Sequence, residues 1–146
     1  MKFKLIIDQN AEEEMILKVK QPSSFTKQIE SFIQTYESQY VIGTYEDETC
    51  KLLFTEIECI TIIDRKVIVV HQNMKHYRIQ ERLRDLELIL PDYFLRINKS
   101  TIANIHAIVR FQSFITGSVN VIFQSGYQDY VSRRCLSEIK RRFKKL

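Results

Sequence analysis

Glycine, proline and cysteine are scarce in this chain of 146 residues, and tryptophan is absent. Three Gly and two Pro leave little material for a flexible linker, and they exclude collagen-like and low-complexity architectures. Cys50, Cys59 and Cys135 are odd in number and form no CxxC pair, so we expect neither a disulfide scaffold nor a cysteine zinc site. No apolar run approaches the ~20 residues of a membrane-spanning helix. Because the first residues are also too acidic for a signal peptide, we expect a cytoplasmic globular protein.

The sequence motifs of common enzyme classes are missing as well. The chain has no glycine-rich phosphate loop, no HExxH, no GxSxG and no dinucleotide fingerprint. His71, His76 and His106 are scattered without the spacing of metal ligands, so ordinary imidazoles are the better interpretation. The acidic run Glu12–Glu14 is typical of a solvated turn. We therefore expect no enzyme, no metal site and no cofactor.

Positive charge is concentrated toward the C-terminus. Residues 1–46 and 47–92 each have a net charge of −2, whereas residues 93–146 carry ten basic and two acidic residues, a net charge of +8. Seven of those basic residues lie in YVSRRCLSEIKRRFKKL, residues 130–146. Such a field favours polyanions, chiefly nucleic acid. A basic C-terminal helix that complements its own dipole explains the same count, so charge alone leaves both interpretations open.

Residues 1–38 are expected to form a small ββα extension. Phe3, Leu5 and Ile7 alternate with Lys2, Lys4 and Ile6, and the segment MILKVK alternates again. Ser23 or Ser24 can cap a helix whose apolar positions share one stripe, namely Phe25, Ile29, Phe32, Ile33 and Tyr36. We expect this stripe to pack against the two strands, in a unit that serves dimerisation or regulation.

Residues 40–146 predict an α+β domain that is mainly antiparallel β. Short β-rich runs separated by polar turns, such as ECITII-DRK-VIVVH, indicate hairpins. Helical spacing returns from Leu83 to Ile89 and ends at Pro91. A last helix is expected from about Arg133, with Leu136, Ile139 and Phe143 directed inward.

One stretch of this domain resembles a known family. The residues are Tyr93-Phe94-Leu95-Arg96-Ile97-Asn98-Lys99-Ser100, then Ile102-Ala103-Asn104, and later Val131-Ser132-Arg133-Arg134 at the start of the last helix. They are similar to the motifs of the LytTR DNA-binding domain, and FTEIECITIIDRKVIVVH resembles that family's first hairpin. The resemblance runs from about Tyr40 to Leu146, roughly 107 residues. Residues 1–38 resemble the short N-terminal segment of stand-alone members and are too short for a receiver domain.

The resemblance implies a β sandwich that reads successive major grooves through three loops rather than through a recognition helix. Carried over by position, the loops are Asp64-Arg65-Lys66, Asn98-Lys99-Ser100 and Arg133-Arg134. Arg65 and Lys66 stand where some members have His, and Lys99 stands where some have Asn. We therefore expect this protein to read a different sequence. The family also implies a homodimer on paired direct repeats, and stand-alone members resemble regulators held in check by a membrane protein.

Side-chain chemistry suggests how the loop residues divide their roles. Lys99, Arg134, Arg65 and Lys66 are assigned to base contacts, because Lys and Arg can reach O6 and N7 of guanine. Asn98, Ser100 and Arg133 are assigned to phosphate contacts that set the register. For Arg96, both a DNA contact and a structural ion pair remain open. Asn104 is expected to be a turn residue, and Tyr93, Phe94 and Phe111 to be core residues.

The sequence therefore predicts a double-stranded DNA-binding transcriptional regulator without catalytic activity. The alternative is a basic module that binds an acidic protein or a membrane surface through the helix carrying Leu136, Ile139 and Phe143. That alternative gives no reason for cationic residues in three separate loops.

Overall fold

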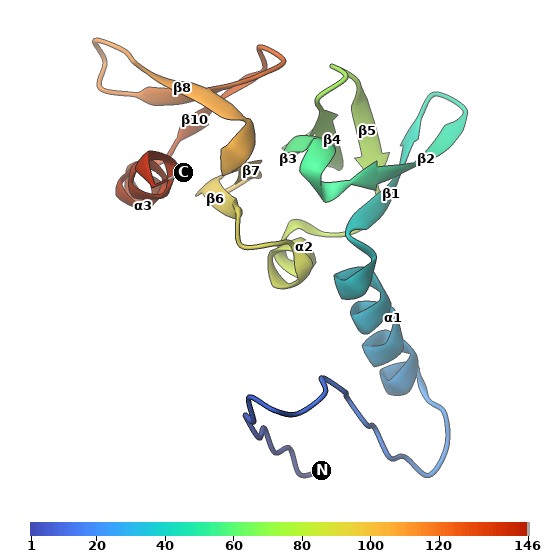
Figure 1. Cartoon of the computed structure of the whole chain (residues 1–146). Helices are drawn as coiled ribbons and strands as arrows, with labels where there is room; N and C mark the ends of the chain where they lie inside the picture. The colour runs from blue at the N-terminus through green and yellow to red at the C-terminus, as the bar shows by residue number, and fades with distance from the viewer. Residues whose placement is uncertain (146) are drawn as a thin grey trace.

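Two antiparallel sheets form the body of the protein, and the computed structural model describes residues 1–145 (Figure 1). The first sheet has seven strands in the order β2-β1-β5-β4-β3-β7-β6, and the second has three in the order β10-β9-β8. The strands of the first sheet are β1 (Tyr40–Tyr45), β2 (Glu48–Leu53), β3 (Ile57–Ile63), β4 (Lys66–His71), β5 (His76–Ile79), β6 (Phe94–Asn98) and β7 (Thr101–Asn104). Those of the second are β8 (Ile108–Ser113), β9 (Val119–Phe123) and β10 (Gln128–Val131). The predicted α+β, mainly antiparallel class is confirmed.

The seven-stranded sheet is apolar on both faces. Successive side chains of a strand point to opposite faces, so Ile60 and Val69 contribute to one core cluster while Cys59 and Val70 contribute to another. A sheet of this kind needs a separate cover on each side.

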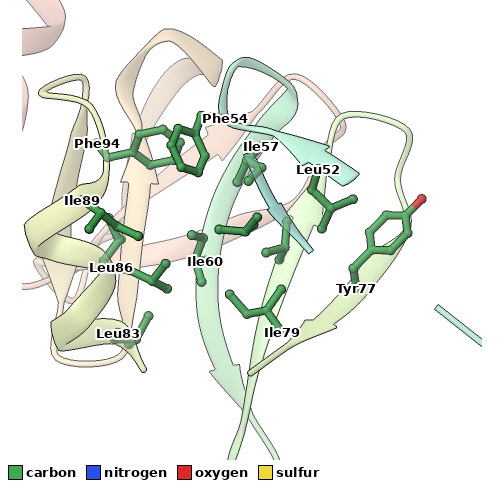
Figure 2. Close-up of a cluster of buried hydrophobic side chains, with 13 residues drawn as sticks. Leu52, Phe54, Ile57, Ile60, Tyr77, Ile79, Leu83, Leu86, Ile89 and Phe94 are labelled. Atoms are coloured by element: carbon green, nitrogen blue, oxygen red, sulfur yellow. The ribbon is translucent and has the colours of Figure 1, made fainter. Parts of the chain in front are cut away.

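The helix α2 (Leu83–Ile89) covers one face of that sheet. Its buried residues Leu83, Leu86 and Ile89 point toward the strands in Figure 2. Phe54 and Phe94 close the end of this cluster with ring centroids 6.3 Å apart in an edge-on arrangement. The helix ends before Pro91, as the sequence predicts.

The opposite face is covered by the three-stranded sheet together with the helix α3 (Arg133–Lys144). Ile139 of α3 is buried, and Phe143 packs edge-on against Phe111 of β8 at 5.2 Å. This confirms that the apolar side of the last helix belongs to the core.

The N-terminal region differs from the expected ββα unit. The helix α1 (Ser24–Ser38) forms and is capped by Ser23, but residues 1–23 contain no strand and are exposed throughout. The expected pair of strands is therefore wrong for the single chain. The physical reason is that an isolated two-stranded hairpin is marginal in water. Among the residues described, no helix is long and apolar enough to cross a membrane.

Candidate nucleic-acid interface

The hairpin between β3 and β4 closes with the shortest possible turn. Ile63 pairs with Lys66, which leaves Asp64 and Arg65 as its two central residues. Their φ angles of 50° and 64° lie in the left-handed region, as a type I′ turn requires. The tight turn projects the exposed Arg65 from the end of the sheet, and the exposed Lys66 begins β4. The expected three-residue loop is thus a two-residue turn plus the first strand residue.

A second two-residue turn joins β6 and β7. Asn98 pairs with Thr101, so Lys99 and Ser100 lie at the tip. Lys99 is exposed and Ser100 is half-buried. Both residues are therefore offered to solvent at the end of the strands, as their proposed contacts need.

Asn98 has a different position from the one the sequence suggested. Its side chain is 1% exposed, its Nδ2 donates to the Tyr130 carbonyl at 2.8 Å, and its Oδ1 accepts from the Ser100 amide at 2.8 Å. Both ends of its amide are engaged inside the protein, so the structure does not present Asn98 to solvent for the phosphate contact that the sequence suggested. Asn98 instead shapes the turn that carries Lys99.

Arg96 also supports this turn from beneath. Its Nε forms an ion pair with Glu87 of α2, and its Nη1 donates to the Lys99 carbonyl at 2.8 Å. Of the two roles left open for Arg96, the structure shows the ion pair. The arginine fixes the backbone of Lys99 and so positions the exposed lysine.

The third cationic segment is the start of α3. Ser132 precedes the helix, and its amide donates to the Ile97 carbonyl of β6 at 2.8 Å. Arg133 and Arg134 are the first two helical residues, and both are exposed. The N-terminal end of the helix adds partial positive charge at the same place.

Backbone pairing brings the three segments to one end of the molecule. The Ile62 amide donates to the Ser100 carbonyl at 3.1 Å, which places the end of β3 beside the second turn. The bonds of Asn98 and Ser132 place the start of α3 on the other side of that turn. The turn with Lys99 therefore lies between the turn with Arg65 and the start of α3.

A chain of hydroxyl groups ties these strands together just behind the turns. The Oγ1 atoms of Thr61 and Thr101 are 2.7 Å apart, and the Thr101 hydroxyl donates to Asp129 of β10 at 2.6 Å. Both threonines are buried. Buried and mutually satisfied bonds of this kind hold the segments at a fixed spacing, which a rigid repeat such as a DNA groove requires.

Arg133 and Arg134 face different hollows. Arg134 and Lys99 line one of about 650 Å³, whose other walls are Glu87, Arg96, Asn98, Tyr130, Ser132 and Cys135. Arg133 lines another of about 340 Å³ together with Thr116, Gly117, Ser118, Val119, Tyr130, Val131, Ser132 and Leu136. Arg134 is thus grouped with Lys99, whereas Arg133 is grouped with the turn between β8 and β9.

Comparison with known proteins now adds the family. A family model described as the LytTr DNA-binding domain matches residues 47–144, about two thirds of the chain. The chain belongs to the LytTR family of DNA-binding domains. The predicted resemblance is therefore confirmed, and the family is one of DNA-binding domains rather than of enzymes.

Relatives of this LytTR protein match nearly its whole length. An uncharacterized HTH-type transcriptional regulator of Staphylococcus aureus strain bovine RF122 / ET3-1 is 26% identical over 144 residues, covering 97% of both chains. One with the same description from strain NCTC 8325 / PS 47 is 27% identical over 146 residues, again covering 97% of both. The LytTr DNA-binding domain of a putative methyl-accepting/DNA response regulator from Bacillus cereus shares the fold, with a TM-score of 0.64 at 20% identity over 70% of this chain and 94% of that one.

The turn between β8 and β9 is a part of the LytTR surface that sequence reasoning missed. It runs between Ser113 and Val119, carries the fully exposed Ile115, and borders the hollow of Arg133. Its residues Thr116, Gly117 and Ser118 carry no charge, so the sequence gives no sign of a nucleic-acid role there. Only the pairing of β9 with β10 brings it next to α3.

Proposed function

We propose that this LytTR protein is a cytoplasmic transcriptional regulator that binds double-stranded DNA in a sequence-specific manner and has no catalytic activity. Lys99, Arg134, Arg65 and Lys66 contact base edges in the major grooves. Ser100 and Arg133 contact phosphates. The observation that carries this proposal is the convergence of three cationic segments at one end of the molecule, tied to each other by backbone hydrogen bonds.

The arrangement of the helices supports groove reading by turns. Among residues 1–145, α1, α2 and α3 are each separated from the next by strands, so no two consecutive helices form a helix-turn-helix pair. The name of the relatives therefore contributes regulation of transcription to the proposal, but not the recognition element. The cationic side chains lie on turns and on the first turn of α3 instead.

The alternative of a membrane-surface or protein adaptor loses its main support. It needs an exposed apolar side on α3, yet Ile139 is buried and Phe143 packs on Phe111. What remains exposed on that helix is charged, as with the Arg141–Glu138 pair. A helix of this kind offers little apolar area to a bilayer.

The proposal includes a homodimer on paired direct repeats, since two copies on one face of a duplex double the number of base contacts. A membrane-protein partner is implied only by the family resemblance. No described residue adds support to it.

The test is affinity for duplexes as a function of salt. A preferred site is first selected from a random duplex pool with the full chain, and a scrambled duplex of the same composition serves as the control. About six phosphate contacts predict that the log of the binding constant falls with the log of the salt concentration with a slope of roughly −5 for both duplexes. The selected duplex is expected to bind more tightly than the scrambled one by the same factor at every salt concentration. Failure to enrich any sequence, or equal affinity for an unrelated acidic polymer, would contradict the proposal.

A further inference from the structure

The first 23 residues carry regularly spaced apolar side chains that no other described part of the chain covers. Phe3, Leu5 and Ile7 are 87%, 73% and 86% exposed. Alternation of apolar and polar residues is typical of a strand with one buried face. A second stretch, Met15–Lys20, repeats the alternation and is also exposed. A lone hairpin is marginal in water, which agrees with the absence of strands from these two stretches of the single chain.

The neighbouring helix α1 has an unused apolar side as well. Its start is well defined, since the Ser23 hydroxyl accepts from the Thr26 amide at 3.3 Å and the Thr26 hydroxyl accepts from the Ser23 amide at 2.9 Å. None of its residues is buried, although one stripe is apolar at Phe25, Ile29, Phe32, Ile33 and Tyr36. The capped helix therefore presents an amphipathic face next to the two amphipathic stretches.

The apolar area involved matches a protein interface. Within residues 1–145, 22 large apolar side chains are exposed, and twelve of them lie in residues 1–36. At their degree of exposure they present on the order of 1,000 Å² of apolar surface, given about 150–250 Å² for a large side chain. The largest apolar patch of an ordinary monomer is about 300–600 Å². A stable complex buries about 800 Å² per partner, so this region has the area that a dimer needs.

The sequence of residues 2–8 is complementary to itself when it is reversed. In an antiparallel pair of two copies centred on Leu5, Phe3 lies opposite Ile7 on the apolar face, and Lys2 lies opposite Asp8 on the other. Leu5 meets its own copy at the centre. Phe3, Leu5 and Ile7 then have apolar partners, and Lys2 and Asp8 have partners of opposite charge, while Lys4 lies opposite Ile6.

The charges of the turn and of the second stretch are also segregated. The turn between the two stretches carries Glu12, Glu13 and Glu14, while the far end of the second stretch carries Lys18 and Lys20. Reversal of one copy relative to the other places the acidic turn of each at the same end of the pair as the basic end of its partner. Such self-complementarity is the mark of a twofold, isologous interface.

We propose that residues 1–38 form the homodimer interface: the Lys2–Asp8 segments of two copies pair antiparallel about Leu5, the Met15–Lys20 segments flank them, and the two α1 helices cover the apolar face. This goes beyond the proposed function: it concerns the dimer in solution, whose copies are related by a twofold axis, whereas copies bound to paired direct repeats are related by translation along the duplex. A DNA or bilayer partner is disfavoured, since the acidic turn at Glu12–Glu14 would repel phosphate groups.

The location of the segment agrees with this role. Figure 1 shows α1 and the preceding residues extending away from the two sheets, on the side opposite the β8–β10 sheet. An interface built there leaves Lys99 and Arg134 free on both copies. The Staphylococcus aureus relatives match over 97% of this chain, so their similarity includes this segment, which precedes the residues matched by the family model.

The first test measures the mass of the full chain in solution without DNA, by light scattering after gel filtration. The wild type is expected at twice the 17.4 kDa of one chain. Leu5→Asp combined with Leu17→Asp places two charges on the apolar face and is expected to give monomers. The matched control, Ile6→Asp combined with Ile16→Asp, alters the other face at similarly exposed positions and is expected to remain dimeric. All four residues are exposed in the single chain, so neither double variant should unfold the domain.

The second test locates the symmetry axis by cross-linking. Directly opposite residues of an antiparallel pair have Cβ atoms about 4.5–5.5 Å apart. Leu5→Cys is therefore expected to give a disulfide-linked dimer under mild oxidation. Ile7→Cys is the control, because its two copies lie four residues apart, roughly 13 Å, which is too far for a disulfide. The wild type, with half-buried Cys50 and Cys135, provides the background.

The outcomes separate this inference from DNA binding. A monomeric wild type, a Leu5→Asp/Leu17→Asp variant that stays dimeric, or equal cross-linking at positions 5 and 7 would each overturn the interface. Affinity for a single half-site is measured on the same samples and is expected to be unchanged in every variant. If half-site binding is absent even in the wild type, the proposed function is contradicted. The interface is then judged only by the masses that light scattering gives for the wild type and the variants.

Discussion

Removal of Lys99 or Arg134 should damage sequence discrimination far more than stability. Both side chains are exposed and line the same hollow, so truncation to Ala leaves no core cavity. Exposed substitutions of this type change the free energy of unfolding by about half a kcal/mol. Loss of one good base contact costs on the order of 1–3 kcal/mol, which corresponds to about a 5- to 150-fold loss of affinity for the preferred site.

Arg133→Ala is the matched control for Arg134→Ala. The two arginines are adjacent and exposed, but they line different hollows on either side of Ser132. Helix geometry separates their side chains by about 100°. A phosphate contact is independent of sequence, so Arg133→Ala is expected to weaken binding to the selected and scrambled duplexes equally.

The assay is the dissociation constant for the selected and scrambled duplexes at one fixed salt concentration, with urea unfolding of each variant alongside. Lys99→Ala and Arg134→Ala should bring the dissociation constants for the selected and scrambled duplexes closer together. Arg133→Ala should leave their ratio unchanged. An unchanged ratio in all three variants would remove these segments from base reading. A narrowed ratio for Arg133→Ala alone would exchange the roles of the two arginines.

Three further outcomes are expected. Asn98→Ala should lower the free energy of unfolding in urea by about 1–3 kcal/mol, because it leaves the Tyr130 carbonyl and the Ser100 amide without a hydrogen-bond partner. A change of less than about half a kcal/mol would refute the structural role. A fragment of residues 39–146 should keep its preference on one half-site and lose cooperativity on two, and loss of preference on the single site would contradict this division of labour. Burial, followed by the nearby Cys59 and Asp129, raises the pKa of Tyr127 from 10.0 to about 12. The stability that the neutral Tyr127 contributes is therefore complete below about pH 10 and is lost as the pH rises toward 12. Tyr127→Phe should reduce the alkaline fall in the free energy of unfolding, and an unchanged fall would contradict this role.

Local patterns in the sequence were sufficient for most elements of the domain. Alternation predicted the hairpin at Asp64-Arg65, and Pro91 correctly ended α2. Ser23 was among the expected caps of α1, and the last helix begins at Arg133 as expected. These features depend on residues close together in the chain. The neighbours β3 and β7, by contrast, are about forty residues apart, and nothing in their local sequence specifies that they pair.

The N-terminal strands show the limit of periodicity as a signal. Alternation reports that a segment suits a strand with one covered face, but it does not report what covers that face. Residues 2–5 alternate as β5 does, yet the single chain leaves them exposed. The interpretation placed the cover within the same chain, on α1. The proposed interface assigns the cover to a second copy instead.

Asn98 shows that residue type alone does not report whether a side chain is exposed or buried. A polar residue beside an exposed lysine in a turn is a reasonable phosphate ligand, and the sequence holds no local sign against it. Its burial comes from Tyr130, 32 residues further on, whose carbonyl accepts the Asn98 amide hydrogen bond. The same bond holds the start of α3 against the second turn. Asn98 is thus a positioning residue between Lys99 and Arg134, so in the proposed function the spacing of their two base contacts depends on a side chain that is buried inside the protein.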